Sequence, residues 1–546
     1  MCEPVLRVYA SPGRACVRFP ADSSFCPVSP YERHVGGFAP HHADWPPWEY
    51  VGFRGGDGGT ERKERAMRIV HTSDWHIGRR FKGLDLLEYQ RNALDWLISF
   101  IEREQVDVLC VAGDVYDSPR PSTGAVRLFN EIFGTLGTMR VNGHPLEIIF
   151  TPGNHDSADR LGTGAALMRP NVHMRCDIET IADPVVVKVD GERLAVYAVP
   201  YLDPDLSRPV LQGMIDAAAP AAEDAGERGG ENGETGMESE TCAKDGEAGR
   251  ATIARSHEGV MKAALQLITN DLAKRRAEDP ALAAILMAHA FVSGAQPSDS
   301  ERNISVGGVD SVPAALFANT GLDYLALGHL HRPQMVVIPR LDPTQSVFHG
   351  TRTPQARYSG ALLAYSFSEC RMPPVEGNGK SVVLLDVDAA REPEAGNNAV
   401  RAVSLATVKS GEPAFASVEG TLEEVLGPLA EEYGEDWVSV TVHLNEYPHG
   451  LYQRIDGKYA NALEKHIEYN GRSASATRTM ADMKSAVDEM DVLEGFVRYS
   501  LGRGIHDDER AVLTRAVEAV RARGAEHAGG SGTAQTNGNK RGEETR

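Results

Sequence analysis

Five short polar segments carry the residues of this sequence that could do chemistry, and each one follows an apolar run. The runs MRIVHTS, VDVLCVAG, LEIIFTPG, LAAILMA and LDYLALG are short and rich in aliphatic or β-branched residues. This pattern is typical of buried strands in a parallel sheet. Because the carboxyl ends of parallel strands face one crevice, we expect the polar residues at these ends to converge: Asp74, His76, Asp114, Asp117, Asn154, His155, Asp156, His289, His329 and His331.

The residue types in this group suit a pair of divalent metal ions. Two cations about 3.5–4 Å apart need a carboxylate that can bridge them, with imidazole, carboxylate or amide ligands on either side. Asp114 is the candidate bridge. Asp74, His76 and His331 would complete one shell, and Asn154, His289 and His329 would complete the other. Mixed nitrogen and oxygen ligands favour Mn²⁺, Fe²⁺ or Zn²⁺ over Ca²⁺, and the absence of a thiolate argues against a closed structural zinc site. Two Mn²⁺ ions are our first choice.

Each segment also has a purely structural interpretation. Asp-x-His can be a polar turn, Gly-Asp and Gly-Asn are common turn dipeptides, and His289 could be a hydrogen-bonded core histidine. The order and spacing favour the metal site, since Asp74, Asp114 and Asn154 follow one another at intervals of forty residues. That interval fits one strand-helix-strand unit.

Length and composition indicate several domains and connecting segments. A chain of 546 residues exceeds one ordinary core, so we expect at least two domains. The formal charge of -21 is unlike that of a protein that grips nucleic acid through Lys and Arg. Residues 221–249 carry nine acidic and two basic side chains, however, and this stretch predicts a disordered acidic insertion over 218–252. The excess charge therefore belongs partly to a linker.

From Met67 the order strand, polar motif, helix repeats, which predicts an α/β domain over 67–370. A helix is expected after the first motif, with Leu87, Leu94, Leu97, Ile98 and Ile101 on one face. After a Pro/Gly-rich break, the alternating run from Ser381, the strand-like run from Trp437 and a helix from about Gly457 predict a smaller α+β domain over 378–475. Helices are expected over 476–525, either completing the local fold or docking a partner.

Both ends of the chain differ from the folded part. Residues 1–66 lack periodicity, so we expect a disordered extension or a true start at Met67; the alternative is a functional arm anchored by Trp45 and Trp48. Residues 526–546 predict a disordered tail. The seven cysteines lack CxxC spacing, and reduced thiols are expected. No run is long and apolar enough for a membrane span or a secretory signal, so a cytoplasmic location is expected.

The five motifs resemble those of calcineurin-like metallophosphoesterases: Asp-x-His, Gly-Asp-x-x-Asp, Gly-Asn-His-Asp, His and Gly-His-x-His. Within this group, four longer segments resemble the SbcD-type nuclease subunits of bacterial SbcCD complexes: HTSDWHIGR (71–79), GDVYDSPRPS (113–122), GHLHRPQ (328–334) and RYSG (357–360). The resemblance is strong over 67–370. After residue 370 it rests on the arrangement of the predicted segments more than on motifs. It implies a metallophosphoesterase sandwich with a capping α+β domain and C-terminal helices.

The resemblance also implies roles for individual residues. It places Asp74, His76, Asp114 and His331 on one metal, and Asp114, Asn154, His289 and His329 on the other. His155 would face the scissile phosphate, stabilising the transition state or protonating the leaving oxygen, instead of binding metal. Asp117 and Asp156 could orient it, or could simply face solvent. Metal-activated water would then attack the phosphoryl group in line.

Substrate and partners follow from the resemblance as well. It implies ATP-dependent 3′–5′ exonuclease activity on double-stranded DNA and endonuclease activity on single strands and hairpins. It also implies an SbcC-type ATPase docked on 476–525, and a homodimer within a heterotetramer on the nucleoid. Five basic residues near the motifs could contact DNA or could be solubilising charges: Arg79, Arg80, Lys82, Arg120 and Arg332. The alternatives are a phosphatase or phosphodiesterase for a small molecule or a protein, and a non-catalytic scaffold.

Overall fold

The computed structural model describes residues 66–218, 252–301, 311–342, 344–350, 352–370, 374–388, 399–469, 489–501 and 504–529. Three predictions fall almost entirely on residues outside these ranges: the N-terminal extension over 1–66, the acidic insertion over 218–252 and the tail over 526–546. The predicted start of the tail is wrong, because residues 526–529 belong to a helix that ends at Gly529.

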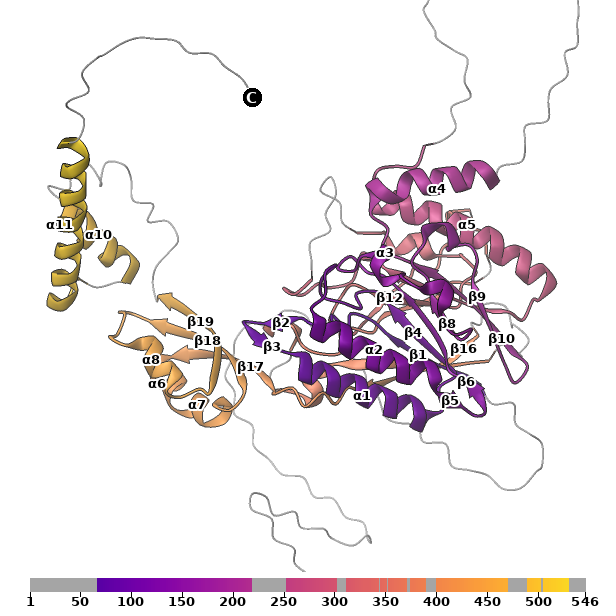
Figure 1. The fold of residues 1–546 in the computed structure, drawn as a ribbon, viewed down its shortest axis with the longest axis horizontal. Coiled ribbons are helices and arrows are strands. Elements are labelled where there is room, and N and C mark those ends of the chain that lie inside the picture. The colour runs from indigo at the N-terminus through magenta and orange to yellow at the C-terminus, as the bar shows by residue number, and fades with distance from the viewer. Residues whose placement is uncertain are drawn as a thin grey trace, which may run out of the picture. The chain divides into compact units, whose positions relative to one another are not determined.

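The first of two large sheets contains the first three metal motifs at its strand ends. Its six strands have the order β16-β15-β1-β4-β7-β8. Figure 1 labels β1, β4, β8 and β16 among them. Strands β1, β4, β7 and β8 are parallel, whereas β15 pairs antiparallel with β1, and β16 with β15. The bounds are β1 Met67–Thr72, β4 Val108–Ala112, β7 Glu147–Thr151, β8 Val172–Met174, β15 Ser381–Val387 and β16 Val400–Thr407.

The second sheet contains the two histidine motifs. Its six strands have the order β13-β14-β12-β11-β10-β9. The inner strands β10, β11, β12 and β14 are parallel, and β9 and β13 are antiparallel to their neighbours. The bounds are β9 Val185–Val189, β10 Glu192–Val199, β11 Ala283–His289, β12 Tyr324–Gly328, β13 Gln334–Val336 and β14 Gln355–Tyr358.

Alternation along the strands shows that the two sheets pack face to face. In β4, Cys110 lies in the core between the sheets, while Leu109 packs in the cluster that contains α1 (Leu87–Glu104) and α2 (Thr123–Thr138). In β10, Val196 lies between the sheets, and Tyr197 packs in the cluster that contains α4 (Pro204–Ala218) and α5 (His257–Glu278). The layers are therefore helix, sheet, sheet, helix. This sandwich confirms the predicted α/β class.

Local signals explain the helices that cover the first sheet. Leu94, Leu97 and Ile101 are buried on one face of α1, as their spacing predicts. Helix α2 begins after Ser122, whose side chain accepts a hydrogen bond from the backbone N–H of Ala125. The shorter elements are the hairpins β2 (Arg80–Phe81) with β3 (Leu84–Asp85) and β5 (Arg140–Val141) with β6 (His144–Pro145), and α3 (Ala158–Leu161).

A smaller three-stranded parallel sheet follows, in the order β17-β18-β19, with its own apolar cluster. Phe415 and Trp437, the first residues of β17 and β18, belong instead to the core of the first large sheet and contact Phe81 there. The bounds are β17 Phe415–Thr421, α6 Leu422–Leu426, α7 Pro428–Tyr433, β18 Trp437–Leu444, α8 Leu451–Asp456 and β19 Asn461–Tyr469; further on are α10 Glu489–Leu501 and α11 Asp507–Gly529.

Two expectations about this part of the chain are wrong. The run from Ser381 does not open the smaller domain, because it forms β15 and pairs with β1 of the first large sheet. No helix starts at about Gly457: α8 ends at Asp456, and the chain continues as β19, which pairs parallel with β18. In both cases a partner strand distant in sequence determines the structure, which local periodicity does not register.

Two further observations concern the described residues. Their cysteines, Cys110, Cys176 and Cys370, are free thiols. Among their helices, none has the length and apolar character that crossing a membrane would require.

Candidate metal centre

The carboxyl ends of strands from both large sheets meet at one place, and glycines make this approach possible. A Cβ atom on Gly328, at the end of β12, would lie 1.8 Å from the carbonyl oxygen of Ala112 at the end of β4. A Cβ atom on Gly113 would lie 2.2 Å from Nδ1 of His289, and one on Gly153 would lie 2.1 Å from Oδ1 of Asp114. Because only glycine leaves this space, the polar motifs of the two sheets can converge.

Four of the predicted ligands adopt a backbone conformation that residues other than glycine rarely adopt. The φ angles of Asp74, His76, Asp114 and His329 are 53°, 43°, 48° and 105°. Hydrogen bonds between the first two motif loops hold this geometry: Asp74 N–H donates to Gly113 O over 3.0 Å, and His76 N–H donates to Asp114 O over 3.0 Å. Such strain persists where the surrounding structure imposes it, and it is concentrated at functional sites.

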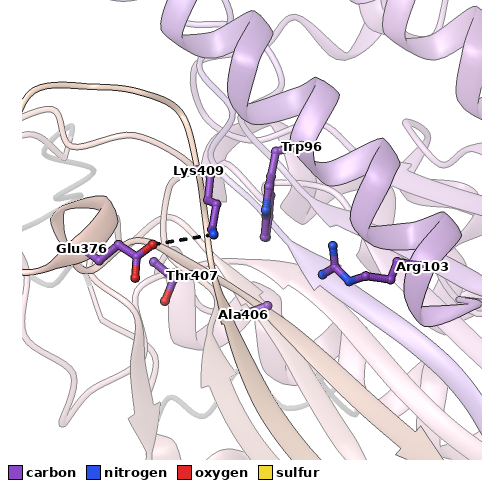
Figure 2. A pocket seen from close by; sticks show the side chains of 6 residues that line it. All are labelled: Trp96, Arg103, Glu376, Ala406, Thr407 and Lys409. Carbon is purple, nitrogen blue, oxygen red and sulfur yellow. Dashed lines mark ion pairs between the residues drawn. The ribbon is translucent and has the colours of Figure 1, made fainter. Parts of the chain in front are cut away.

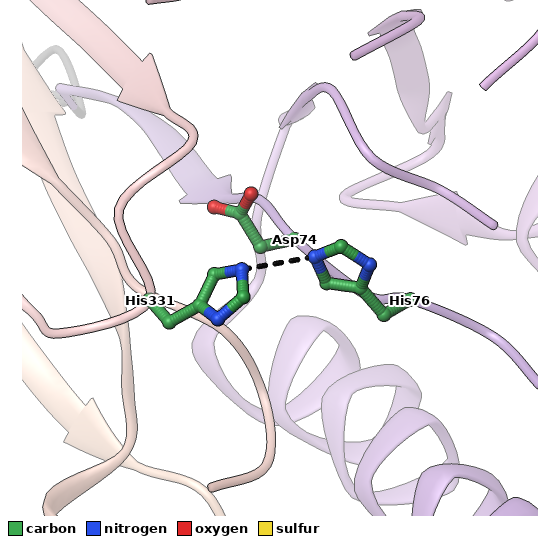
Figure 3. Close-up of side chains that lie close together, drawn as sticks. All are labelled: Asp74, His76 and His331. Atoms are coloured by element: carbon green, nitrogen blue, oxygen red, sulfur yellow. Dashed lines mark hydrogen bonds between the residues drawn. The ribbon is translucent and has the colours of Figure 1, made fainter. Parts of the chain in front are cut away.

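Asp74, His76 and His331 form the first group of ligand atoms (Figure 3). One ligand atom from each lies within 4.8 Å of the others, and all three residues are buried. The Nε2 atoms of His76 and His331 face each other at 3.0 Å. Ser73 Oγ donates to Asp74 Oδ2, and the backbone N–H of His329 donates to both Asp74 carboxylate oxygens.

Asp114, Asn154, His289 and His329 form the second group. His289 Nε2 lies 3.4 Å from Asp114 Oδ2 and 2.9 Å from Asn154 Oδ1, and His329 Nδ1 lies 3.2 Å from the same Asn154 oxygen. Asp114 Oδ2 is also 3.5 Å from Nε2 of His76 in the first group. Asp114 thus lies between the two groups, which is the position that a bridging carboxylate requires.

Burial and neighbouring charges shift the pKa values of these groups in different directions. Burial holds the pKa values of His76 and His329 well below the ordinary value, so both rings are neutral and keep a lone pair for a ligand. Burial acts to raise the pKa of Asp114, but His289, His76 and His155 together outweigh it, and the net pKa lies well below the usual range. Conversely, burial lowers the pKa of His289 while Asp114 raises it, to about 9. These imidazole, carboxylate and amide groups fit two divalent first-row metal ions.

His155 lies beside both groups without being part of either. Its backbone N–H donates to Asp114 Oδ1 over 2.8 Å, and its ring lies 4.7 Å from the ring of His76, centroid to centroid. Its Nδ1 lies 2.9 Å from the carbonyl oxygen of Asp117, whose carboxylate is 3.3 Å from His76 Nδ1 and 3.5 Å from Arg79. The backbone of Asp117, more than its charge, therefore fixes the ring of His155.

Asp156 forms hydrogen bonds with the backbone of the motif loops. Its carboxylate accepts hydrogen bonds from the backbone N–H groups of Val115, Tyr116 and Gly153, over 2.9, 2.9 and 3.0 Å. Burial and then the negative charge of Asp114 raise the pKa of Asp156 to about 7. The side chain joins the loop after β4 to the loop after β7.

The five basic residues have different environments. The guanidinium of Arg79 donates to Ser300 O and lies over the Tyr365 ring, so it is mostly covered. Arg332 donates to a backbone carbonyl of Ser368. The remaining three are exposed: Arg80, Lys82, which pairs with Glu464 over 2.6 Å, and Arg120.

Three residues close to His331 were not predicted from the sequence: Ser300, Glu369 and Lys380. No motif marks Ser300 or Glu369. Lys380 directly precedes an apolar strand, and this position gave no indication that its ammonium group is buried.

A separate cavity of about 360 Å³ lies between α1 and β16 (Figure 2). The Trp96 indole contributes its apolar wall, and Lys409 pairs with Glu376 at its rim over 3.8 Å. The residues that line it do not include any of the predicted ligands: Trp96, Arg103, Glu376, Ala406, Thr407 and Lys409.

Comparisons with known proteins found a family match and related chains. The family described as calcineurin-like phosphoesterase matches residues 67–207. The chain is 32% identical over 329 residues to the SbcD subunit of the nuclease SbcCD from Bacillus subtilis (strain 168), covering 60% of this chain and 68% of that protein. A solved structure described as GAP50, the anchor in the inner membrane complex of Plasmodium, covers 63% of this chain and 90% of its own, with 10% identity and a TM-score of 0.30.

The family match and the SbcD relative define the class of this protein as a metal-dependent phosphoesterase. The chain belongs to the SbcD family of nuclease subunits within the calcineurin-like phosphoesterases, and it is a metal-dependent phosphodiester hydrolase.

Proposed function

We propose that this protein is the nuclease subunit of an SbcCD-type DNA repair complex and hydrolyses DNA phosphodiesters with two Mn²⁺ ions. The observation that carries the proposal is the position of Asp114, whose Oδ2 lies within 3.5 Å of imidazole nitrogens from both ligand groups. Similarity to the SbcD subunit of a bacterial nuclease supports DNA as the substrate class.

Asp74, His76, Asp114 and His331 would hold one ion, and Asp114, Asn154, His289 and His329 the other. When bound, the two cations would polarise the phosphoryl group and activate a water molecule for in-line attack. The chain's own residues position the scissile phosphate and handle the protons.

His155 is the proposed proton donor to the leaving oxygen. Its Nδ1 faces the carbonyl oxygen of Asp117 at 2.9 Å. A carbonyl only accepts hydrogen bonds, so Nδ1 carries hydrogen and Nε2 is the atom available to the substrate. In the protonated ring, Nε2–H donates to the phosphate during the transition state and passes its proton to the leaving oxygen.

The smaller domain is proposed to cap the site and position duplex DNA. Two contacts support this role because they connect the domain to the segment directly after the first metal motif. Phe81 stacks near Trp437 with ring centroids 6.1 Å apart, and Lys82 pairs with Glu464 on β19. Arg80, Lys82 and Arg120 are exposed and could contact phosphates; this role stays a prediction.

Helices α10 and α11 are proposed to dock an SbcC-type ATPase. They contact each other and carry large apolar side chains that are exposed in the described part of the chain: Phe496 at 60%, Val512 at 56% and Val520 at 69%. Exposed apolar side chains on two helices in contact support an interaction site there. In this proposal the protein acts in the cytoplasm, as a dimer bound to two ATPase subunits, with ATP-dependent 3′–5′ exonuclease and hairpin endonuclease activity.

The test is cleavage of a labelled hairpin duplex by the purified full-length protein with Mn²⁺, alone and with the SbcC-type ATPase and ATP. Asp114→Ala removes the central carboxylate and should abolish cleavage, while Asp159→Asn, at an exposed position on α3, should cleave like wild type. If simple phosphate esters are hydrolysed and the hairpin stays intact, the substrate assignment is wrong and a phosphatase or small-molecule phosphodiesterase takes its place.

A further inference from the structure

A buried polar chain lies behind His331, on the side of the ring that faces away from the other ligands. Ser300 Oγ lies 2.6 Å from Nδ1 of His331 and donates a hydrogen bond to Oε1 of Glu369. The other oxygen of Glu369 pairs with the Lys380 ammonium. The side chains of Glu369 and Lys380 are 0% and 1% exposed. Fully buried charged residues are rare in proteins unless they are paired, and removing one partner of such a pair is destabilising.

Four separate segments meet at this chain. His331 follows β12, Ser300 lies in the loop after β11, Glu369 belongs to the turn η4 (Phe367–Glu369), and Lys380 directly precedes β15. Lys380 Nζ also donates to the backbone carbonyl of His331 over 2.9 Å. The backbone N–H of His331 donates to Glu301 Oε1 over 2.8 Å. His331 is therefore held at its backbone N–H, its backbone carbonyl and its ring.

The hydrogen-bonding capacities of these groups determine which ring nitrogen of His331 carries hydrogen. Glu369 is an ionised carboxylate beside an ammonium group, so it can only accept. The single hydrogen of Ser300 therefore points to Glu369, and the Ser300 oxygen must accept from Nδ1–H of His331. The other ring nitrogen, Nε2, then keeps its lone pair and faces His76 at 3.0 Å, on the ligand side.

We propose that Ser300, Glu369 and Lys380 are positioning residues that hold His331 in the tautomer and orientation required for metal binding. The inference rests on the proposed metal centre and extends it beyond the ligands. Hydrogen-bond partners of this kind typically contribute 10- to 100-fold to metal affinity. None of the three side chains touches the substrate in this proposal.

The experiment measures Mn²⁺ binding to the full-length protein by electron paramagnetic resonance, which reports free Mn²⁺ and needs no DNA. Ser300→Ala should bind one of two Mn²⁺ ions about 10- to 100-fold more weakly than wild type. Ser300→Thr keeps the hydroxyl and should restore the affinity. The matched control is Ser207→Ala, which removes a buried hydroxyl on α4 that has no hydrogen-bond partner in the described structure; its affinity should equal that of wild type.

A second comparison tests whether Ser300 acts through His331. In a His331→Ala background, Ser300→Ala should cause no further loss of affinity, because the group that it positions is gone. The melting temperature of each metal-free variant is measured in parallel. The proposal is overturned if Ser300→Ala binds both ions like wild type. It is also overturned if Ser300→Ala weakens Mn²⁺ binding as much in the His331→Ala background as it does in the wild-type background. Failure of the nuclease assignment is distinct: it would appear as absent DNA cleavage by a wild-type protein that binds both ions.

Discussion

The substitution of glycine by alanine should have opposite effects at two positions of this chain. At Gly328 a Cβ atom would lie 1.8 Å from the backbone oxygen of Ala112 and 2.9 Å from His289 Nδ1. At Gly134, on the exposed face of α2, a Cβ atom would meet nothing within 4 Å. The same methyl group is thus added once between two buried strand ends and once on a solvent-facing helix surface.

The magnitudes follow from these surroundings. Cβ atoms essentially never approach another atom closer than 3.0 Å, so Gly328→Ala must push two backbone segments apart at the junction of the sheets. Inserting a methyl group into a packed core destabilises by about 1–3 kcal/mol, and the value should lie at or above the upper end because the clashing atom is backbone. Gly134→Ala should stabilise by about 0.5–1 kcal/mol, since alanine has the higher helix propensity.

Urea unfolding of the chelated full-length proteins, followed by circular dichroism, measures both effects. Mn²⁺ binding is measured alongside, because the strand ends that separate in Gly328→Ala lead to His329 and Asp114. This variant should lose affinity, and Gly134→Ala should not. If Gly328→Ala is as stable as wild type and still binds Mn²⁺, the two strand ends do not meet as described, and the argument for convergence fails.

Three further predictions concern chemistry and pH. His155→Ala should slow hairpin cleavage by about 10²- to 10⁴-fold, which is the usual contribution of a positioned general acid. The same variant should bind Mn²⁺ like wild type, and weaker Mn²⁺ binding would instead make His155 a metal ligand. Chelation should abolish cleavage. Mn²⁺ at about 100 times its Kd should restore it and stabilise the fold by about 2.7 kcal/mol for each ion bound, visible as a higher melting temperature. Burial raises the pKa of the Glu412 carboxyl from its ordinary 4.5 to about 8, so the native state keeps a proton that the unfolded chain releases. The free energy of unfolding should therefore fall as the pH rises from 4.5 to 8. Urea unfolding at both ends of this range measures the effect, and Glu412→Gln should flatten the pH dependence.

Much of the fold was predictable because its signals are local. The strands buried on both faces appear as continuous apolar runs, and β1, β4, β7, β11 and β12 lie where those runs lie. The face of α1 was visible in the spacing of Leu94, Leu97 and Ile101. The candidate ligands could be named for the same reason, since each directly follows such a run.

The tertiary structure decided what depends on partners distant in sequence. The run from Ser381 joins the first sheet, and Asn461–Tyr469 forms a strand, because β1 and β18 offer backbone hydrogen bonds to them. The ionic pair of Glu369 and Lys380 has no sequence signature, because burial and proximity arise only after four separate segments have packed together. The sequence by itself determined which side chains follow the strands; the packing of two sheets determined how close those side chains lie and which groups hold them.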